Sequence, residues 1–365
     1  MVIFMLIFSL QCVKEELPLE TLKEAYEGIS LMGTALNTWQ IMGKDPQSIA
    51  LAQEQYNSIT AENVMKWEKV HPEKGVYDFK MADAFVEFGE KNNMAIIGHT
   101  LVWHSQTPKW VFEDEQGGLA DPDTLLKRLK DHIFTVAGRY QGRIHGWDVV
   151  NETFNDDGTF RQSKWFQILG ETYIEKAFQW AHEADPKAEL YYNDFNMWHE
   201  GKRDAVVRLV KKMQSLNIPI HGIGLQGHWG LDYPPLDILD MALDAYSGTG
   251  LHVMVTEMDV NILPLPDSEI TAEISKRAKL RDELNPYPEV LPDSMQTVLA
   301  DRYADLFNAL LQYEESLSRV TFWGVQDGFS WLNHFPVRGR TNYPLLFDRA
   351  YEPKPAFYSV MQLGK

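Results

Sequence analysis

The chain is poor in cysteine and in basic residues. Its 365 residues contain one cysteine, Cys12, so no intramolecular disulfide can form. There are 34 basic residues against 52 acidic ones, which gives a formal net charge of −18. A field of that sign repels polyanions. We therefore expect neither nucleic acid nor an anionic membrane surface as a partner, whereas a neutral ligand remains compatible with this charge.

Apolar runs long enough to span a bilayer are also lacking. The run "MVIFMLIFSL" at the start is too short for that but suits the apolar part of a signal peptide, although it has no basic residues before it. Cys12 follows it as in a lipoprotein signal, with Gln11 an unusual residue before a lipidated cysteine. We expect residues 1–18 to be a signal peptide or lipoprotein signal plus a short linker. The protein would then be secreted or lipid-anchored through Cys12. A frayed N-terminus or a misassigned start is the alternative, and a cytoplasmic location then stays open.

Linkers and low-complexity tracts are absent after about Leu19. We therefore expect residues 19–365 to form one domain, and a monomer. The hydrophobic share of 44% is ample for a large core. The length is normal for a single α/β barrel with insertions.

Eight short apolar runs recur along the chain. Most are continuously apolar, as strands buried on both faces are. Apolar residues at helical spacing follow the fourth run, from Phe166 to Ala181, and the fifth run, from Ala205 to Leu216. This alternation predicts a single (β/α)8 TIM barrel rather than an open sheet. The predicted strands are residues 29–37, 57–63, 95–103, 144–152, 189–194, 220–229, 251–259 and 320–327.

One region interrupts this alternation. Residues 261–296, after the seventh predicted strand, are rich in proline and charge. Connections of that length are usually functional or disordered. We expect an enlarged loop over the active face of the barrel, with a short helix within "SEITAEISKRAKL" as an option.

Polar side chains mark the ends of the predicted strands. In a barrel these ends converge on one mouth, where active sites lie. A lone asparagine there more often caps the next helix, but eight strand ends that also carry glutamate and tryptophan favour a site. The residues are Asn37, Glu62, Asn63, His99, Trp103, Asn151, Glu152, Asn193, Asp194, Gln226, His228, Glu257, Asp259, Trp323 and Gln326.

Two of these residues form a natural catalytic pair. Glu152 ends "DVVNE" and Glu257 ends "VMVTE", so two apolar strands each finish in a carboxylate. With no reactive cysteine and no serine in a nucleophile-elbow motif, paired carboxylates suit acid/base and nucleophilic work on an acetal. A metal site built from His99, His104, His228 and Asp259 is the chemical alternative. It lacks the His-x-His pair typical of metal-dependent barrel hydrolases, and close Cys/His spacing.

Taken together, the strand-end motifs resemble those of the endo-β-1,4-xylanases of glycoside hydrolase family 10. The resemblance covers residues 20–363, and it rests on the motifs occurring together in order. They are "GTALN", "ITAENVMKWE", "GHTLVWHSQTPKW", "WDVVNE", "YYNDFN", "GIGLQGHW", "VTEMD", "WGVQDGFSWL" and "TNYPLLFD".

The resemblance implies a retaining hydrolysis of xylan and xylo-oligosaccharides that needs no cofactor. Glu152 matches the acid/base and Glu257 the nucleophile, and retention implies carboxyl groups roughly 5–5.5 Å apart. Asn151 matches the donor to the sugar 2-hydroxyl. His228 and Asp259 look like the groups that orient Glu257 and keep it ionised.

The resemblance also implies a sugar-binding lining. Residues matching the glycone side start with Glu62, Asn63 and Lys66, and are completed by His99, Trp103, Gln106, Asn193 and Gln226. Trp323 and Trp331 would cover the cleft and favour xylose, which has no C6 hydroxymethyl, over glucose.

Three residues depart from the family pattern. Phe195 stands where tyrosine is usual, which removes a hydroxyl and leaves the ring. His334 and Phe335 stand where asparagine and tryptophan are common, which puts the strength of nearby sugar binding in question. Two other functions use the same framework: a β-1,4-glucanase or aryl-β-glycosidase, and a non-catalytic xylan-binding or inhibitor protein. Intact carboxylates argue against the last.

Overall fold

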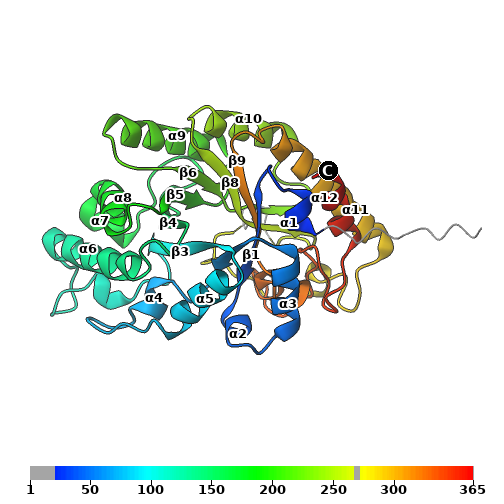
Figure 1. The fold of residues 1–365 in the computed structure, drawn as a ribbon, viewed down its shortest axis with the longest axis horizontal. Coiled ribbons are helices and arrows are strands. Elements are labelled where there is room, and N and C mark those ends of the chain that lie inside the picture. Colours follow the sequence, from blue (N-terminus) through cyan, green and yellow to red (C-terminus); the bar gives the residue numbers. More distant parts are fainter. Residues whose placement is uncertain (1–20, 267–271, 365) are drawn as a thin grey trace, which may run out of the picture.

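Eight parallel strands close into a barrel with helices around it, as the sequence predicts. The computed structural model describes residues 21–266 and 272–364, and Figure 1 shows the helices arranged around the strands. The described residues form β1 (Leu31–Leu36), β2 (Ser58–Ala61), β3 (Ala95–Trp103), β4 (Gly146–Asn151), β5 (Glu189–Asp194), β6 (Gly222–Leu225), β7 (His228–Gly230), β8 (His252–Asn261) and β9 (Leu317–Phe322).

Barrel closure joins the first strand of the sheet to the last. The strands pair in parallel in the order β1 to β6, then β8 and β9, and β9 returns to β1. The pairing of Leu31 with Arg319 begins that last contact. All strands therefore run the same way, and their carboxyl ends meet at one mouth.

The sixth predicted strand is divided in two. β6 belongs to the barrel, whereas β7 lies outside it and, among the strands of residues 21–266 and 272–364, pairs only with β8. Gly227 stands between them with φ of 80°, a left-handed conformation that suits glycine. A Cβ atom there would also press against Val255 of β8. The glycine thus turns the chain and starts a second, displaced strand.

The helices lie on the outside of the barrel, and in the described part of the chain none is long and apolar enough to cross a membrane. They are α1 (Leu22–Ala25), α2 (Thr38–Ile41), α3 (Pro46–Gln55), α4 (Trp67–Val70), α5 (Lys80–Lys91), α6 (Pro122–Arg139), α7 (Lys164–Leu169), α8 (Thr172–Ala184), α9 (Glu200–Ser215), α10 (Leu236–Ser247), α11 (Asp293–Leu311) and α12 (Pro355–Leu363), with short 3₁₀ helices η1 (Lys109–Val111), η2 (Asp282–Leu284), η3 (Asp327–Phe329) and η4 (Trp331–Asn333).

Local sequence explains where several helices begin and end. Asp121 caps α6 by accepting a hydrogen bond from the Thr124 amide at 3.0 Å, with proline next at the first helical position. The helical pattern after β4 is two helices, because Gly170 ends α7 with φ of 59°. A glycine of this kind is a helix stop that apolar spacing alone does not reveal.

The long connection after β8, the seventh strand of the barrel, is confirmed. It runs from the end of β8 to the start of α11, and residues 272–281 contain no helix. Arg161 forms an ion pair with Glu273 of this loop at 2.7 Å. The loop is therefore tied to the segment that follows β4. The expected signal segment lies outside the described residues, as does part of the optional helix.

A tight contact between β3 and β4 offers a test of barrel packing. Gly98 stands beside Trp147, which is fully buried, and a Cβ atom at Gly98 would overlap the indole ring. We expect Gly98→Ala to lower the free energy of unfolding by about 1–3 kcal/mol, measured by denaturant unfolding. Gly138→Ala in α6, where nothing outside the neighbouring backbone of the same helix lies within 4 Å of the added Cβ, is the matched control. It should be neutral or stabilising by up to about 1 kcal/mol, and equal losses in both variants would contradict this account.

Candidate active site

A cleft at the mouth of the barrel collects most of the residues predicted from the strand ends. The residues matched to the family's catalytic and sugar-binding groups all line it except Asn193 and Asp259, which are fully buried behind it. Asn37, Asp194 and Gln326, also predicted at strand ends, do not line the cleft. The lining consists of Glu62, Asn63, Lys66, His99, Trp103, Gln106, Asn151, Glu152, Gln226, His228, Glu257, Ala272, Ile274, Trp323 and Trp331.

The backbone turns at Glu152, directly after β4. Its φ is 59°, a conformation that costs a residue other than glycine about 1–2 kcal/mol. The Glu152 amide still donates to the Asn193 carbonyl at 2.9 Å, so the residue stays attached to β5. The register of β4 on β5 also shifts between Asp148 and Val150. Irregularities of this kind re-aim side chains near functional sites, and here the carboxylate reaches the cleft.

Glu152 is buried and held by two neutral donors. The Trp103 indole donates to Oε2 at 2.8 Å and the Gln226 amide to Oε1 at 3.0 Å. Burial raises the pKa of this carboxyl, and although the two hydrogen bonds and the charge of Arg161 oppose it, the net direction is upward. The negative charge of Glu257 also raises it. Glu152 is therefore biased toward its protonated form.

Glu257, in the middle of β8, has the opposite bias. Asn193 donates to its Oε1 at 2.8 Å, and His228 Nε2 lies 3.3 Å from its Oε2. Burial raises the pKa of Glu257, but the hydrogen bond from His228 and the charges of His99, His228 and Lys66 together lower it below the ordinary value. The charged form of Glu257 is therefore favoured.

His228 is placed by the displaced strand β7. The β7–β8 pairing sets His228 opposite Asp259, and its Nδ1 lies 3.1 Å from Asp259 Oδ2. Burial lowers the pKa of His228, but Asp259 and Glu257 outweigh it and raise the pKa to about 10. The same Asp259 oxygen accepts from the Trp331 indole at 2.7 Å. A buried cation thus stands between two carboxylates.

A row of amide side chains connects the two glutamates. From Glu152 it runs through Gln226, whose Nε2 lies 3.3 Å from Asn151 Oδ1. Asn193 Nδ2 lies 3.1 Å from the same Asn151 oxygen and donates to Glu257. Because every member touches the next, each carboxylate is fixed relative to the other.

The floor of the cleft is charged. Lys66 Nζ donates to Asn63 Oδ1 at 3.2 Å and lies 4.7 Å from the centre of the Trp103 ring. Burial lowers the pKa of Lys66 despite the carboxylates around it, and burial raises the pKa of Glu62, which Lys66 and Asn63 partly offset. Gln106 donates to Asn63 at 3.3 Å. These groups offer several donors and acceptors to a hydroxylated ligand.

Aromatic rings form the walls. Trp323 meets His99 edge-on at 5.4 Å between centroids, and Trp331 lies 4.7 Å from His228. Phe335 stacks on Trp331 at 4.6 Å, so this departure from the family pattern supports a cleft wall. His334 is exposed. Faces of this kind bind the apolar faces of flat ligands.

Some residues of the site were not among the predictions. Ala272 and Ile274 reach the cleft from the long loop, and Arg161 acts on Glu152 through its charge. His104 Nδ1 lies 3.8 Å from Glu152 Oε2, although the sequence suggested it only as a metal ligand. Asn193 was expected in the lining but lies behind it. Loop residues carried no periodic signal, so only the fold brings them here.

Two of the three histidines of the metal alternative, His99 and His228, are engaged by carboxylates. His99 Nδ1 lies 2.9 Å from Asp148 Oδ2, and His228 lies between Glu257 and Asp259. In residues 21–266 and 272–364 no group of three or more His, Cys, Asp or Glu side chains could hold a metal ion. What the site does contain is one carboxyl biased to hold a proton and one biased to lose it, a pairing suited to acid-assisted displacement at an acetal carbon.

Comparisons with known proteins identify the family of the chain. An endo-1,4-beta-xylanase A of Xylanibacter ruminicola is 45% identical over 343 residues, which cover 94% of this chain and 93% of that protein. A beta-1,4-xylanase of Dictyoglomus thermophilum is 41% identical, covering 99% of this chain and 97% of its own. A solved endoxylanase from a sugarcane soil metagenome superimposes with a TM-score of 0.92 at 45% identity, covering 94% and 99%. The profile of glycosyl hydrolase family 10 matches residues 21–363, and the chain belongs to that family.

Proposed function

We propose that the protein hydrolyses internal β-1,4-xylosidic bonds of xylan with retention of anomeric configuration. The observation that carries the proposal is the pair of buried glutamates with opposite pKa shifts, Glu152 raised and Glu257 lowered. Membership of the family and the names of the relatives support xylan as the substrate.

The first step forms a covalent intermediate. Glu152 donates its proton to the glycosidic oxygen as the bond to the anomeric carbon breaks, and Glu257 attacks that carbon from the other face. The shortened xylan leaves as an alcohol and the sugar remains as an ester of Glu257. The hydrogen bond from Asn193 and the charge of His228 hold the attacking carboxylate in place before it reacts.

The second step restores both carboxyl groups. Esterification removes the negative charge of Glu257, which had raised the pKa of Glu152. The pKa of Glu152 therefore falls, and the carboxylate takes a proton from an entering water. That water attacks the anomeric carbon, the ester bond breaks, and Glu152 is protonated again. The two inversions together give retention.

The cleft lining suits a xylose chain. We assign Lys66, Glu62 and Asn63 to sugar hydroxyls, and Asn151 to the 2-hydroxyl of the sugar that is attacked. Trp323 and Trp331 close one side of the cleft. Bulky rings at that point disfavour a C6 hydroxymethyl group, so glucose chains should fit less well than xylose chains.

Substrate choice and stereochemistry test the proposed reaction. The purified protein should hydrolyse xylan faster than carboxymethyl-cellulose, measured as reducing ends released. Proton NMR of early products should show the β-anomer first. Faster action on the cellulose derivative would favour a glucanase, and an α-anomer formed first would contradict retention.

Separate substitutions should divide the roles of the two glutamates. Glu257→Ala removes the nucleophile and should lower hydrolysis of every substrate at least a hundredfold, about 2.7 kcal/mol of barrier. Glu152→Ala should lower xylan hydrolysis to a similar extent. It should slow bond cleavage much less with an aryl xyloside whose leaving group is acidic, because such a group leaves without a proton. Equal losses on both substrates in Glu152→Ala would contradict its assignment as the acid.

The pH profile of kcat/KM should respond in a predictable direction. Activity requires ionised Glu257 and protonated Glu152, so it rises through the first pKa and falls through the second. Arg161→Met removes a charge that lowers the pKa of Glu152, so the alkaline limb should move to higher pH. His228→Asn removes groups that lower the pKa of Glu257, so the acid limb should also move up.

A distant arginine serves as the control for these profiles. Arg139 forms its ion pair with Asp83 at 2.6 Å on the outside of the barrel. Arg139→Met should leave both limbs in place. An alkaline limb that moves down in Arg161→Met, or an acid limb that is unchanged in His228→Asn, would overturn the assigned electrostatics.

A further inference from the structure

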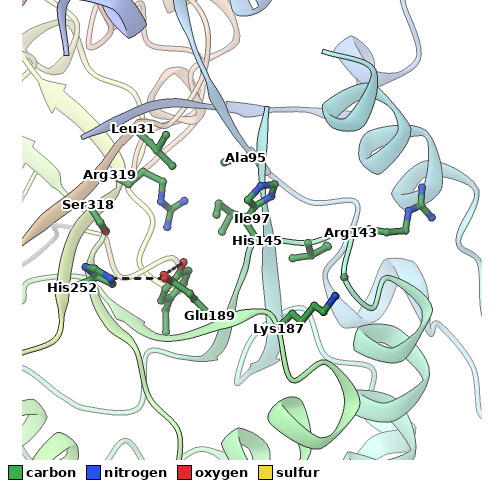
Figure 2. Close-up of a pocket in the computed structure, with 13 residues that line it drawn as sticks. Leu31, Ala95, Ile97, Arg143, His145, Lys187, Glu189, His252, Ser318 and Arg319 are labelled. Carbon is green, nitrogen blue, oxygen red and sulfur yellow. Dashed lines mark hydrogen bonds and ion pairs between the residues drawn. The ribbon is translucent and has the colours of Figure 1, made fainter. Parts of the chain in front are cut away.

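A second cavity lies at the opposite end of the barrel from the cleft. Its volume is about 440 Å³, and Figure 2 shows the residues that line it. Leu31, Ala95 and Glu189 are the first residues of β1, β3 and β5, and His252 is the first of β8. The cavity therefore opens at the amino ends of the strands. It shares no lining residue with the cleft in which the proposed reaction takes place.

An arginine with no carboxylate partner reaches into this cavity. Arg319 of β9 is 2% exposed. Its Nη1 lies 3.4 Å from Thr60 Oγ1 of β2, and its Nη2 lies 3.5 Å from the sulfur of Met254 in β8. Contacts with strands on several sides place the guanidinium inside the barrel. These hydrogen bonds are long, or weak because the acceptor is sulfur. In the described part of the chain Arg319 forms no ion pair.

The acidic residue of the cavity lining, Glu189, is otherwise engaged. Glu189 accepts from the Tyr191 hydroxyl at 2.8 Å and lies 3.8 Å from His252. Figure 2 shows Glu189 and His252 joined by that ion pair, on the side of the cavity where Ser318 and Arg319 are drawn. Glu189 therefore gives Arg319 no direct counterion.

Other wall residues add positive charge or donors. Lys187 is exposed at the rim of the cavity. His145 Nδ1 accepts from the Ile96 amide at 3.0 Å, so the neutral ring carries its proton on Nε2 and can donate from there. Arg143 also lines the wall, but both oxygens of Glu90 bind it at 2.7 Å. Arg319 and Lys187 are thus the cations left for a ligand.

Arg319 also lies 3.4 Å from Thr321 Oγ1 and 5.7 Å from the centre of the Tyr191 ring, but these neutral contacts supply no counterion. A buried positive charge without a counterion is costly, so the cavity is suited to an anion. The planar fork of a guanidinium matches two oxygens of one oxyanion, with shorter and stronger hydrogen bonds than neutral donors give. We propose that this cavity is a binding site for a small tetrahedral oxyanion such as phosphate or sulfate, with Arg319 as its main ligand. The bound anion neutralises Arg319 and stabilises the amino end of the barrel.

Phosphate binding to the full-length protein tests the site directly. ³¹P NMR titration should show saturable binding, and low-millimolar phosphate or sulfate should raise the melting temperature more than chloride at equal ionic strength. Such salts also stabilise proteins through exclusion from the surface, but that effect is not saturable and does not depend on Arg319. Absence of saturable phosphate binding to the unmodified protein overturns the proposal.

Three variants separate a built site from general charge effects. Arg319→Met fills the same space without charge and should abolish the saturable binding, and replacing a buried charge in this way often leaves a protein folded. Glu189→Gln removes the opposing charge and should tighten binding several-fold. Arg143→Met, the control, should bind as the unmodified protein does.

The outcomes are distinct for each variant. Unchanged binding in Arg319→Met, or weaker binding in Glu189→Gln, contradicts the assignment. Should Arg319→Met fail to fold, the contrast between Glu189→Gln and Arg143→Met still decides, because only the first is expected to change phosphate affinity. Activity is not the readout, so failure of the xylanase proposal would not affect this test.

Discussion

The burial of two like charges close together is the constraint on which this site depends. Glu152 and Glu257 are 6% and 5% exposed, and neither has bulk water to stabilise its charge. Two carboxylates in such surroundings do not both ionise readily. The protein moves the pKa values of the two carboxyl groups apart by giving them different neighbours. Neutral indole and amide donors surround Glu152, whereas a charged histidine lies beside Glu257. That asymmetry gives one group the proton and the other the charge.

The asymmetry is itself a product of the fold. The pairing of β7 with β8 places His228 opposite Asp259. Without β7, His228 would not be held there, and Glu257 would lose the cation beside it. On the other side of the cleft, the Arg161–Glu273 ion pair both holds the long loop and brings a positive charge near Glu152. Elements outside the barrel strands therefore tune groups that the strands position.

Strand ends were the most predictable part of this protein. Continuous apolar runs located the barrel strands, and the polar residues at their ends were brought together because parallel strands share one mouth. Apolar spacing predicted one strand where Gly227 divides two, and one helix where Gly170 divides two. The spacing of apolar residues does not show where the backbone adopts a left-handed conformation. Asn193 was misplaced because pattern shows which strand carries a residue, but not how deep it lies. Arg319 was passed over because the eighth run was taken to begin at Val320.

Closure of the barrel by β1 and β9 has a consequence for how the molecule folds. Until β9 (Leu317–Phe322) pairs with β1, the sheet has two open edges. Each edge offers unpaired backbone groups to other chains. Joining segments so far apart in sequence is slow, because the entropy of closing the intervening chain is lost before the contact forms. The half-built sheet is thus the stage at which chains can aggregate, and charge repulsion between molecules of net charge −18 works against it.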